Sequence, residues 1–381
     1  MGATRQPRVS KALRRLRDEL GLDQADWLAF LKLAREGFSD WERAQGLQYD
    51  EPLDLEEVPE EWVQDHHAIG FLTLRVLRGE STAVTAAVVE FFLRICDPEP
   101  DALDSPPGLG AAWLYAVKMG LPVPVDAGRL AFLAMQSPQR FFQGVDEPDL
   151  PALSRLILEA KGPPEAWDLH VLLVAVDRAG IHVRAPFRLF HAWMSADWLT
   201  TEIKREFCRG LLGCPPQAER LRQRDAAFRN MLETTDDWWG RFPMLALELA
   251  RFGPQRMLPG LRRHAVLALV EHVGEPAGEV IEEFLLSPDR LGLESANVRE
   301  GALDVVKACA EELGPDATRR YLDQGISDRA APVRHAAYRI GLKEFGPAYV
   351  RSATDDPAAS VRKWATKALA SSGSGKSRSK G

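Results

Sequence analysis

Residues 261–369 decide the fold, because one short motif occurs in them four times. The motif consists of a branched apolar residue, an arginine, two variable residues and an alanine. Successive copies begin 37, 35 and 28 residues apart, and each opens a run of apolar residues at helical spacing. This pattern predicts helical hairpins whose first helix packs along one side. The four copies read Leu261-Arg262-x-x-Ala265, Val298-Arg299-x-x-Ala302, Val333-Arg334-x-x-Ala337 and Val361-Arg362-x-x-Ala365.

A polar or acidic turn lies just before the second, third and fourth copies. Such turns stop one helix and cap the next. Repeated helices need fixed polar links between neighbours, so we expect the motif arginines to bond aspartates of adjacent turns. The turns read Ser287-Pro288-Asp289, Ser327-Asp328 and Asp355-Asp356-Pro357.

Over about 110 residues, this pattern resembles the HEAT and armadillo-like repeat family, including its short bacterial form. The resemblance implies an all-α fold in which helical hairpins stack into a right-handed superhelix. It also implies a binding surface rather than a reaction centre, because such stacked repeats hold partners along an extended face. The partner is not identified by the resemblance, since one fold carries many functions.

Composition and charge set further expectations. An apolar content of 45% and a charged content of 27% are typical of a globular protein without membrane spans, and no apolar run reaches about 18 residues. The first residues lack the apolar core of a secretory signal, so we expect a cytoplasmic protein. The net charge of −7 is unevenly distributed: residues 1–17 contain six basic and no acidic residues, and residues 50–65 contain eight acidic and no basic ones. From residue 331 onward, ten basic residues face three acidic ones.

The N-terminal segment resembles a Cro/Xre-type helix-turn-helix. The resemblance is carried by Leu13-Arg14-Arg15-Leu16-Arg17-Asp18-Glu19-Leu20-Gly21, by Leu22-Asp23-Gln24-Ala25-Asp26-Trp27 and by Ser39-Asp40-Trp41-Glu42-Arg43. In this family the second helix of the motif enters the major groove of DNA. The resemblance therefore implies DNA contacts at four positions, which are Gln24, Arg35, Ser39 and Arg43.

Three positions in this segment differ from the family pattern, and they keep a second interpretation open. Leu28 replaces a small residue, Lys32 replaces the glycine of the turn, and Gly37 lies inside the expected recognition helix. The alternative is an amphipathic helical cap whose core contains Trp27 and Trp41.

The rest of the chain predicts further helices. Lys118-Met-Gly120-Leu121 and, sixty residues later, Arg178-Ala-Gly180-Ile181 each end one apolar helix before another begins, so both glycines are expected to be C-caps. Residues 97–110 are rich in Pro, Asp and Gly and predict an exposed loop. We expect an N-terminal helical segment at 1–50, a repeat-like region at 55–250, HEAT-like repeats at 255–370 and a disordered tail at 371–381.

Within the motif copies, the positions two and six residues after each start share one helix face. Stacked copies would align these positions into a charged strip that runs from mixed through acidic to basic. Such a strip suits a protein or peptide of complementary charge. The predicted partner-binding residues are Arg263, Glu300, Asp304, His335, Arg339, Lys363 and Lys367.

No set of catalytic, metal-binding or cofactor-binding residues stands out. Gly375-Lys376-Ser377 lacks the earlier glycine of a phosphate-binding loop, and no His-Glu-x-x-His occurs. We therefore predict no cofactor, no metal and no enzymatic activity. The first functional hypothesis is a helical-repeat scaffold that binds a protein or peptide along its concave face. The second is a DNA-binding regulator whose repeats sense a ligand or dimerise. The oligomeric state remains open in both.

Overall fold

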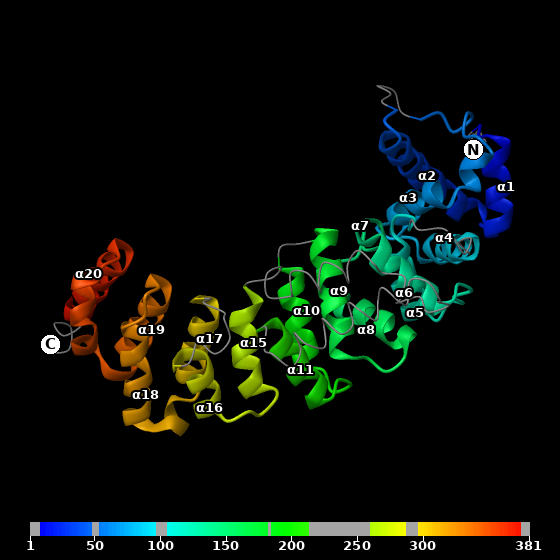
Figure 1. The fold of residues 1–381 in the computed structure, drawn as a ribbon. Coiled ribbons are helices and arrows are strands. Elements are labelled where there is room, and N and C mark those ends of the chain that lie inside the picture. Colours follow the sequence, from blue (N-terminus) through cyan, green and yellow to red (C-terminus); the bar gives the residue numbers. More distant parts are fainter. Residues whose placement is uncertain are drawn as a thin grey trace, which may run out of the picture. The chain divides into compact units, whose positions relative to one another are not determined.

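In the computed structural model, residues 8–47, 53–96, 105–181, 184–212, 260–286 and 296–374 are described (Figure 1). Over these ranges the chain is helical, and they contain no β-strand. The helices of these ranges all fall short of the length and apolar character needed to cross a membrane. The described residues divide into two compact units, an N-terminal unit at 8–192 and a C-terminal unit at 193–374. The predicted tail at 371–381 and the region 213–259 lie mostly or wholly outside the described residues.

The N-terminal unit contains the helices up to α9 and most of α10. Its helices are α1 (Lys11–Leu20), α2 (Gln24–Ala44), the short η1 (Glu61–Val63), α3 (His66–Val76), α4 (Thr82–Ile95), α5 (Leu109–Met119), α6 (Ala127–Gln136), α7 (Pro138–Phe141), the short η2 (Glu147–Asp149), α8 (Leu150–Lys161), α9 (Ala166–Ala179) and α10 (Ala185–Met194).

Local signals set the helix ends in this unit. The Ser10 hydroxyl accepts a hydrogen bond from the Leu13 amide at the start of α1, and Gly21 ends that helix in the left-handed conformation. The Asp23 carboxylate accepts from two amides at the start of α2. Gly120 and Gly180 end α5 and α9 with positive φ, as the sequence predicts.

The predicted turn of the helix-turn-helix is absent. Residues 24–44 form one continuous helix, α2, which passes through Lys32 without a break. Gly37 lies where α2 crosses α3, and a Cβ atom there would come within 2.6 Å of the Leu72 Cα. The glycine therefore permits a close helix crossing. Residues 8–47 consequently lack the geometry that the resemblance implies.

The predicted exposed loop at 97–110 is wrong for its described part. Residues 105–110 are buried, and α5 already begins at Leu109. Pro107 packs against α3 at Gly70, where an added Cβ would lie 2.6 Å from the Pro107 carbonyl oxygen. Proline supplies apolar surface while lacking the amide that burial would leave unsatisfied, so the segment can be covered.

The C-terminal unit places each motif copy in the first turns of a helix. Its elements are α11 (Thr201–Leu211), α15 (Leu261–Glu271), α16 (Ala277–Ile281) with the π-helical turn η4 (Glu282–Leu286), α17 (Ala296–Ala308), α18 (Ala310–Ile326), α19 (Ala331–Phe345), the short η6 (Pro347–Asp355) and α20 (Ala359–Ser374).

The motif helices pack on one another in chain order, α15 on α17, α17 on α19 and α19 on α20. The element between two motif helices packs against both of them: α18 contacts α17 and α19, and η6 contacts α19 and α20. The motif's apolar residue and alanine are buried in all four copies. The prediction that the apolar residue and the alanine of each motif copy lie on one buried helix face is therefore confirmed.

Candidate binding cleft

Motif arginines cross-link successive helices through the turns. The Arg299 guanidinium donates two hydrogen bonds to the Asp328 carboxylate, in the turn before α19, one of them 3.0 Å long. The Arg334 guanidinium donates two of 2.8 Å to Asp356, in the turn before α20. All four side chains are almost completely buried, with 2–11% of their surface exposed. The expectation that motif arginines bond aspartates of adjacent turns is confirmed for these two copies.

Arg334 and Arg362 also bind the turn that precedes their own helix. Arg334 donates to the carbonyl oxygens of Asp328 and Arg329 at 2.9 and 3.0 Å. Arg362 donates to those of Asp356 and Pro357 at 2.7 and 2.9 Å. These contacts give Arg299, Arg334 and Arg362 a structural role. The turn before the second copy, at 287–289, lies outside the described residues.

The predicted strip does align across the first two copies, but its acidic residues face a basic neighbour. Arg263 on α15 donates to Glu300 at 2.7 Å and to Asp304 at 2.9 Å, both on α17. Hydrogen bonding to Asp304 raises the pKa of Arg263, which stays a cation. Burial, together with the charge of Asp304, raises the pKa of Glu300 against the opposing effect of Arg263. Glu300 and Asp304 are therefore bonded to Arg263 within the fold, and their contact with a partner stays a prediction.

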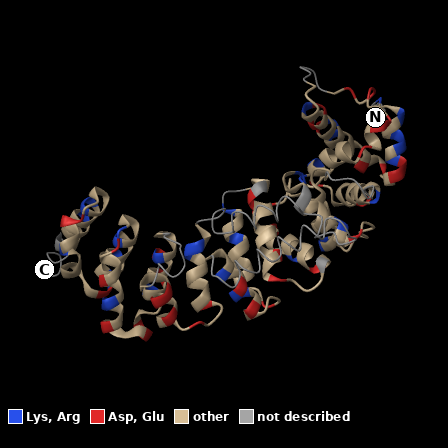
Figure 2. Ribbon diagram, in the orientation of Figure 1, with Lys and Arg blue, Asp and Glu red and all other residues tan. Residues whose placement is uncertain are grey.

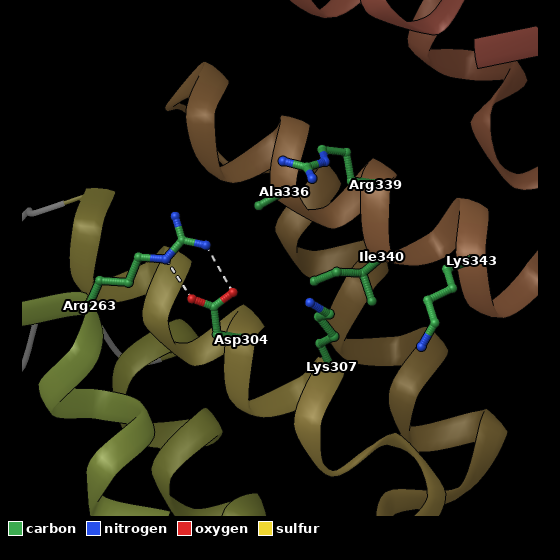
Figure 3. Close-up of a pocket in the computed structure, with 7 residues that line it drawn as sticks. All are labelled: Arg263, Asp304, Lys307, Ala336, Arg339, Ile340 and Lys343. Atoms are coloured by element: carbon green, nitrogen blue, oxygen red, sulfur yellow. Dashed lines mark hydrogen bonds and ion pairs between the residues drawn. The ribbon is translucent and has the colours of Figure 1, made fainter. Parts of the chain in front are cut away.

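A cleft of about 240 Å³ lies beside this ion-pair cluster (Figure 3). Ile340 and Ala336 of α19 contribute its apolar lining. Figure 3 shows Arg263 and Asp304 joined at one side, and the Lys307 and Lys343 side chains extending near Ile340. The lining residues are Arg263, Asp304, Lys307, Ala336, Arg339, Ile340 and Lys343.

The cleft is lined by more basic than acidic side chains. Within the described part of the chain, Lys307 and Arg339 form no ion pair. Lys343 pairs with its neighbour Glu344 at 3.3 Å, in an exposed contact of little energetic value. Figure 2 shows Lys and Arg recurring on α17, α19 and α20.

The basic side of the cleft continues toward α20. His335 lies against Trp364, with ring centroids 4.9 Å apart. Burial, and then the charge of Arg339, lower the pKa of His335, so this residue is neutral near pH 7. Lys363 and Lys367 are exposed on α20 and have no ion-pair partner among the described residues.

The residues assigned to DNA by the helix-turn-helix resemblance all lie on the single helix α2. Gln24 and Arg35 are exposed on α2, and Ser39 is half-buried. Arg43 donates to Asp40 at 2.8 Å, and Asp40 in turn accepts from Arg75 of α3 at 2.6 Å. This part of α2 is thus bonded to α3, and DNA contact through the four residues stays a prediction.

Four cleft residues were not predicted: Lys307, Lys343, Ala336 and Ile340. They lie three, seven, nine or ten residues after a motif start, beyond the two positions that define the strip. Considering more positions along each motif helix would have included them, because residues three or four apart share a helix face. The available signal was the pair of lysines in the last turns of two successive motif helices.

The described ranges also bear on metal and phosphate binding. They contain no group of three or more His, Cys, Asp or Glu side chains able to hold a metal ion. The glycine-lysine-serine segment at 375–377 lies outside those ranges. In comparisons with known proteins, no family model, no curated protein and no solved structure matches this chain.

Proposed function

We propose that the chain is a HEAT-like helical-repeat protein whose C-terminal unit binds a protein or peptide partner. The binding surface is the cleft between α17 and α19 and the basic side chains that continue onto α20. The proposal includes the right-handed superhelical stacking implied by the motif. It assigns the chain a binding role and no reaction.

The observation that carries the proposal is the position of Arg339. This residue lies in the middle of α19, exposed, without an ion pair among the described residues, and it lines the cleft. Lys307 and Lys343 have a structural use, because cations in a last helical turn stabilise the helix dipole by about 0.3–1 kcal/mol. Arg339 has no such use, and its charge disfavours protonation of His335. An uncompensated guanidinium beside an apolar lining suits an external carboxylate.

The size of the cleft supports a peptide over a small molecule. Its volume of about 240 Å³ is below the roughly 300–1,000 Å³ of pockets that enclose drug-sized ligands. It is large enough for one side chain of a partner, while the remaining contacts would spread over the neighbouring helix faces.

The test is a capture experiment with the full chain and two charge reversals. Arg339→Glu reverses the charge at the cleft, whereas Arg351→Glu reverses an exposed, unpaired arginine on η6 that does not line it. We expect proteins retained from the native cell by the wild type to be retained by Arg351→Glu and lost with Arg339→Glu. Mass spectrometry of the three samples measures this.

Circular dichroism and a thermal melt of both variants control for folding. Both residues are exposed, so equal melting temperatures are expected. If the two variants retain the same proteins as the wild type, the cleft is not the binding site and the proposal fails.

A further inference from the structure

We infer that the cleft's occupant is an acidic peptide segment in which an aliphatic side chain is flanked by carboxylates. This inference rests on the proposed function and names the chemistry of its ligand. The aliphatic side chain would pack on Ile340 and Ala336, one carboxylate would bind Arg339, and another would lie near the Lys307 and Lys343 ammonium groups.

The lining requires an apolar element in the ligand. Ile340 is 7% exposed, and Ala336 is half-buried beside it. A purely polar ligand would leave this remaining apolar surface in contact with water, whereas an aliphatic side chain packed on it would remove apolar surface from water on both sides. An aliphatic residue of a partner therefore fits the centre of the cleft better than a second charge.

The basic side chains around the apolar lining favour a negatively charged ligand. Three basic side chains from two helices border the apolar lining, and among the described residues only Lys343 of the three forms an ion pair, in an exposed contact. Carboxylates placed against them gain from charge complementarity and fix the register of the segment. Arg339 in particular offers the planar fork of donors that matches a carboxylate in two hydrogen bonds.

The side of the cleft toward α15 distinguishes a peptide from a nucleic acid. Arg263 there is shared by two carboxylates, Glu300 and Asp304, so this cluster carries an excess of negative charge. A nucleic acid has a phosphate at every nucleotide and would place one against this cluster. In a peptide, by contrast, the charge can differ along the chain. Acidic residues can contact α19 while neutral or basic residues contact α15. Lys363 and Lys367 on α20 extend the basic side for further acidic residues.

Binding of labelled synthetic peptides to the full chain, measured by fluorescence polarisation, tests the inference. The first peptide carries a central leucine with glutamates on both sides. The second replaces the leucine by serine, and the third replaces the glutamates by glutamine. A single-stranded and a double-stranded DNA oligonucleotide serve as polyanions without the apolar element. Each ligand is titrated against the wild type, Arg339→Glu and Arg351→Glu.

We expect the leucine–glutamate peptide to bind the wild type and Arg351→Glu with equal affinity. Arg339→Glu should weaken it by about tenfold or more, since the new charge repels the carboxylate. The serine and the glutamine peptides should both bind more weakly. Equal binding of the first two peptides, unchanged binding to Arg339→Glu, or tighter binding of either DNA would each overturn the inference.

The two levels of the claim fail separately. If capture from the native cell depends on Arg339 but the leucine–glutamate peptide does not bind, the cleft remains a partner site and the ligand chemistry is wrong. If capture is also insensitive to Arg339→Glu, the proposed function fails as well.

Discussion

Arg334 shows why the motif specifies arginine. Its guanidinium binds both carboxylate oxygens of Asp356 and two carbonyl oxygens of the preceding turn at the same time. A lysine ammonium is a single point of charge and could not satisfy this planar set of acceptors. The arginine therefore fixes the spacing between α19 and both flanking turns.

Replacing Asp356 by alanine should destabilise the chain strongly. The substitution leaves the Arg334 guanidinium, whose side chain is 11% exposed, without its charged partner, and breaking such a buried pair costs about 3–5 kcal/mol. It also removes the cap on the Ala358 amide. The matched control is Asp355→Ala, next in the chain and exposed, which should change stability by less than about 0.5 kcal/mol. Urea denaturation of the two variants measures the difference.

The pH dependence of that difference identifies the ion pair as its source. Hydrogen bonds from Arg334 lower the pKa of Asp356 below its ordinary value of 3.8. The stability contributed by the pair is therefore fully present above the unfolded pKa and is lost as pH falls through the lower, folded value. The gap between wild type and Asp356→Ala should be constant from neutral pH down to about 5 and shrink below about 4. A gap that stays constant below pH 4 would assign the effect to packing instead.

Single residues were predicted unevenly from the sequence. The arginine–aspartate bonds followed from a fixed arginine in each copy and an acid in each intervening turn. The strip prediction did not anticipate the ion pairs of Glu300 and Asp304, although the alignment that places them on one face also places them beside Arg263. Opposite charges at the strip positions of adjacent copies therefore indicated an ion pair within the fold. Lys363 and Lys367 form no such pair among the described residues.

Helix α17 lies close to α15 because Gly301 has no side chain. A Cβ atom at Gly301 would come within 2.7 Å of the Arg263 carbonyl oxygen and 3.0 Å of the Val266 Cβ. Since one of these atoms is backbone, the two helices would have to move apart to admit it. The close approach also brings Arg263 within reach of both acids on α17, so it helps to build one wall of the cleft.

Gly301→Ala should consequently lower the free energy of unfolding by about 1–3 kcal/mol, the usual cost of overpacking. Gly278→Ala is the control, because it is also a glycine within a helix and its added Cβ would meet only the Tyr321 hydroxyl, at 3.9 Å. This control should be neutral or stabilising by up to about 1 kcal/mol, since alanine favours a helix. Equal melting temperatures for both variants would show that α15 and α17 do not cross at Gly301.

Helix α2 illustrates how an element can be misread from its residues. The stretch from Gln24 to Arg43 resembles two short helices, but the chain forms one, because Lys32, Leu33 and Ala34 all favour a helix and none supports a turn. Gly37, a departure from the family pattern in the sequence, permits the close crossing of α2 and α3. Helix existence was thus predictable, whereas the glycine's role depends on a neighbour distant in sequence.

At the level of the whole molecule, the distribution of charge makes ionic strength a test of the cleft. Ten basic and three acidic residues lie from residue 331 onward, although the chain as a whole carries −7. Attraction of an acidic peptide by exposed side chains is screened over about 8 Å at 0.15 M salt and about 3 Å at 1 M. Affinity for the leucine–glutamate peptide should therefore fall steadily between about 0.1 and 1 M salt. The same titration with Arg339→Glu should show a shallower slope; equal slopes would place the peptide elsewhere.

The two halves of each arginine–aspartate bond are encoded in different copies of the motif, with the arginine in one helix and its acceptor in the turn before the next. Duplication or loss of one complete copy would therefore leave an arginine such as Arg299 or Arg334 matched to an acid in the next turn. Among the described residues, Arg362 of the fourth copy donates to the carbonyl oxygens of the turn that precedes its own helix. The C-terminal unit can thus gain or lose one motif copy at a time in evolution. Such a change would not leave a buried guanidinium without its charged partner.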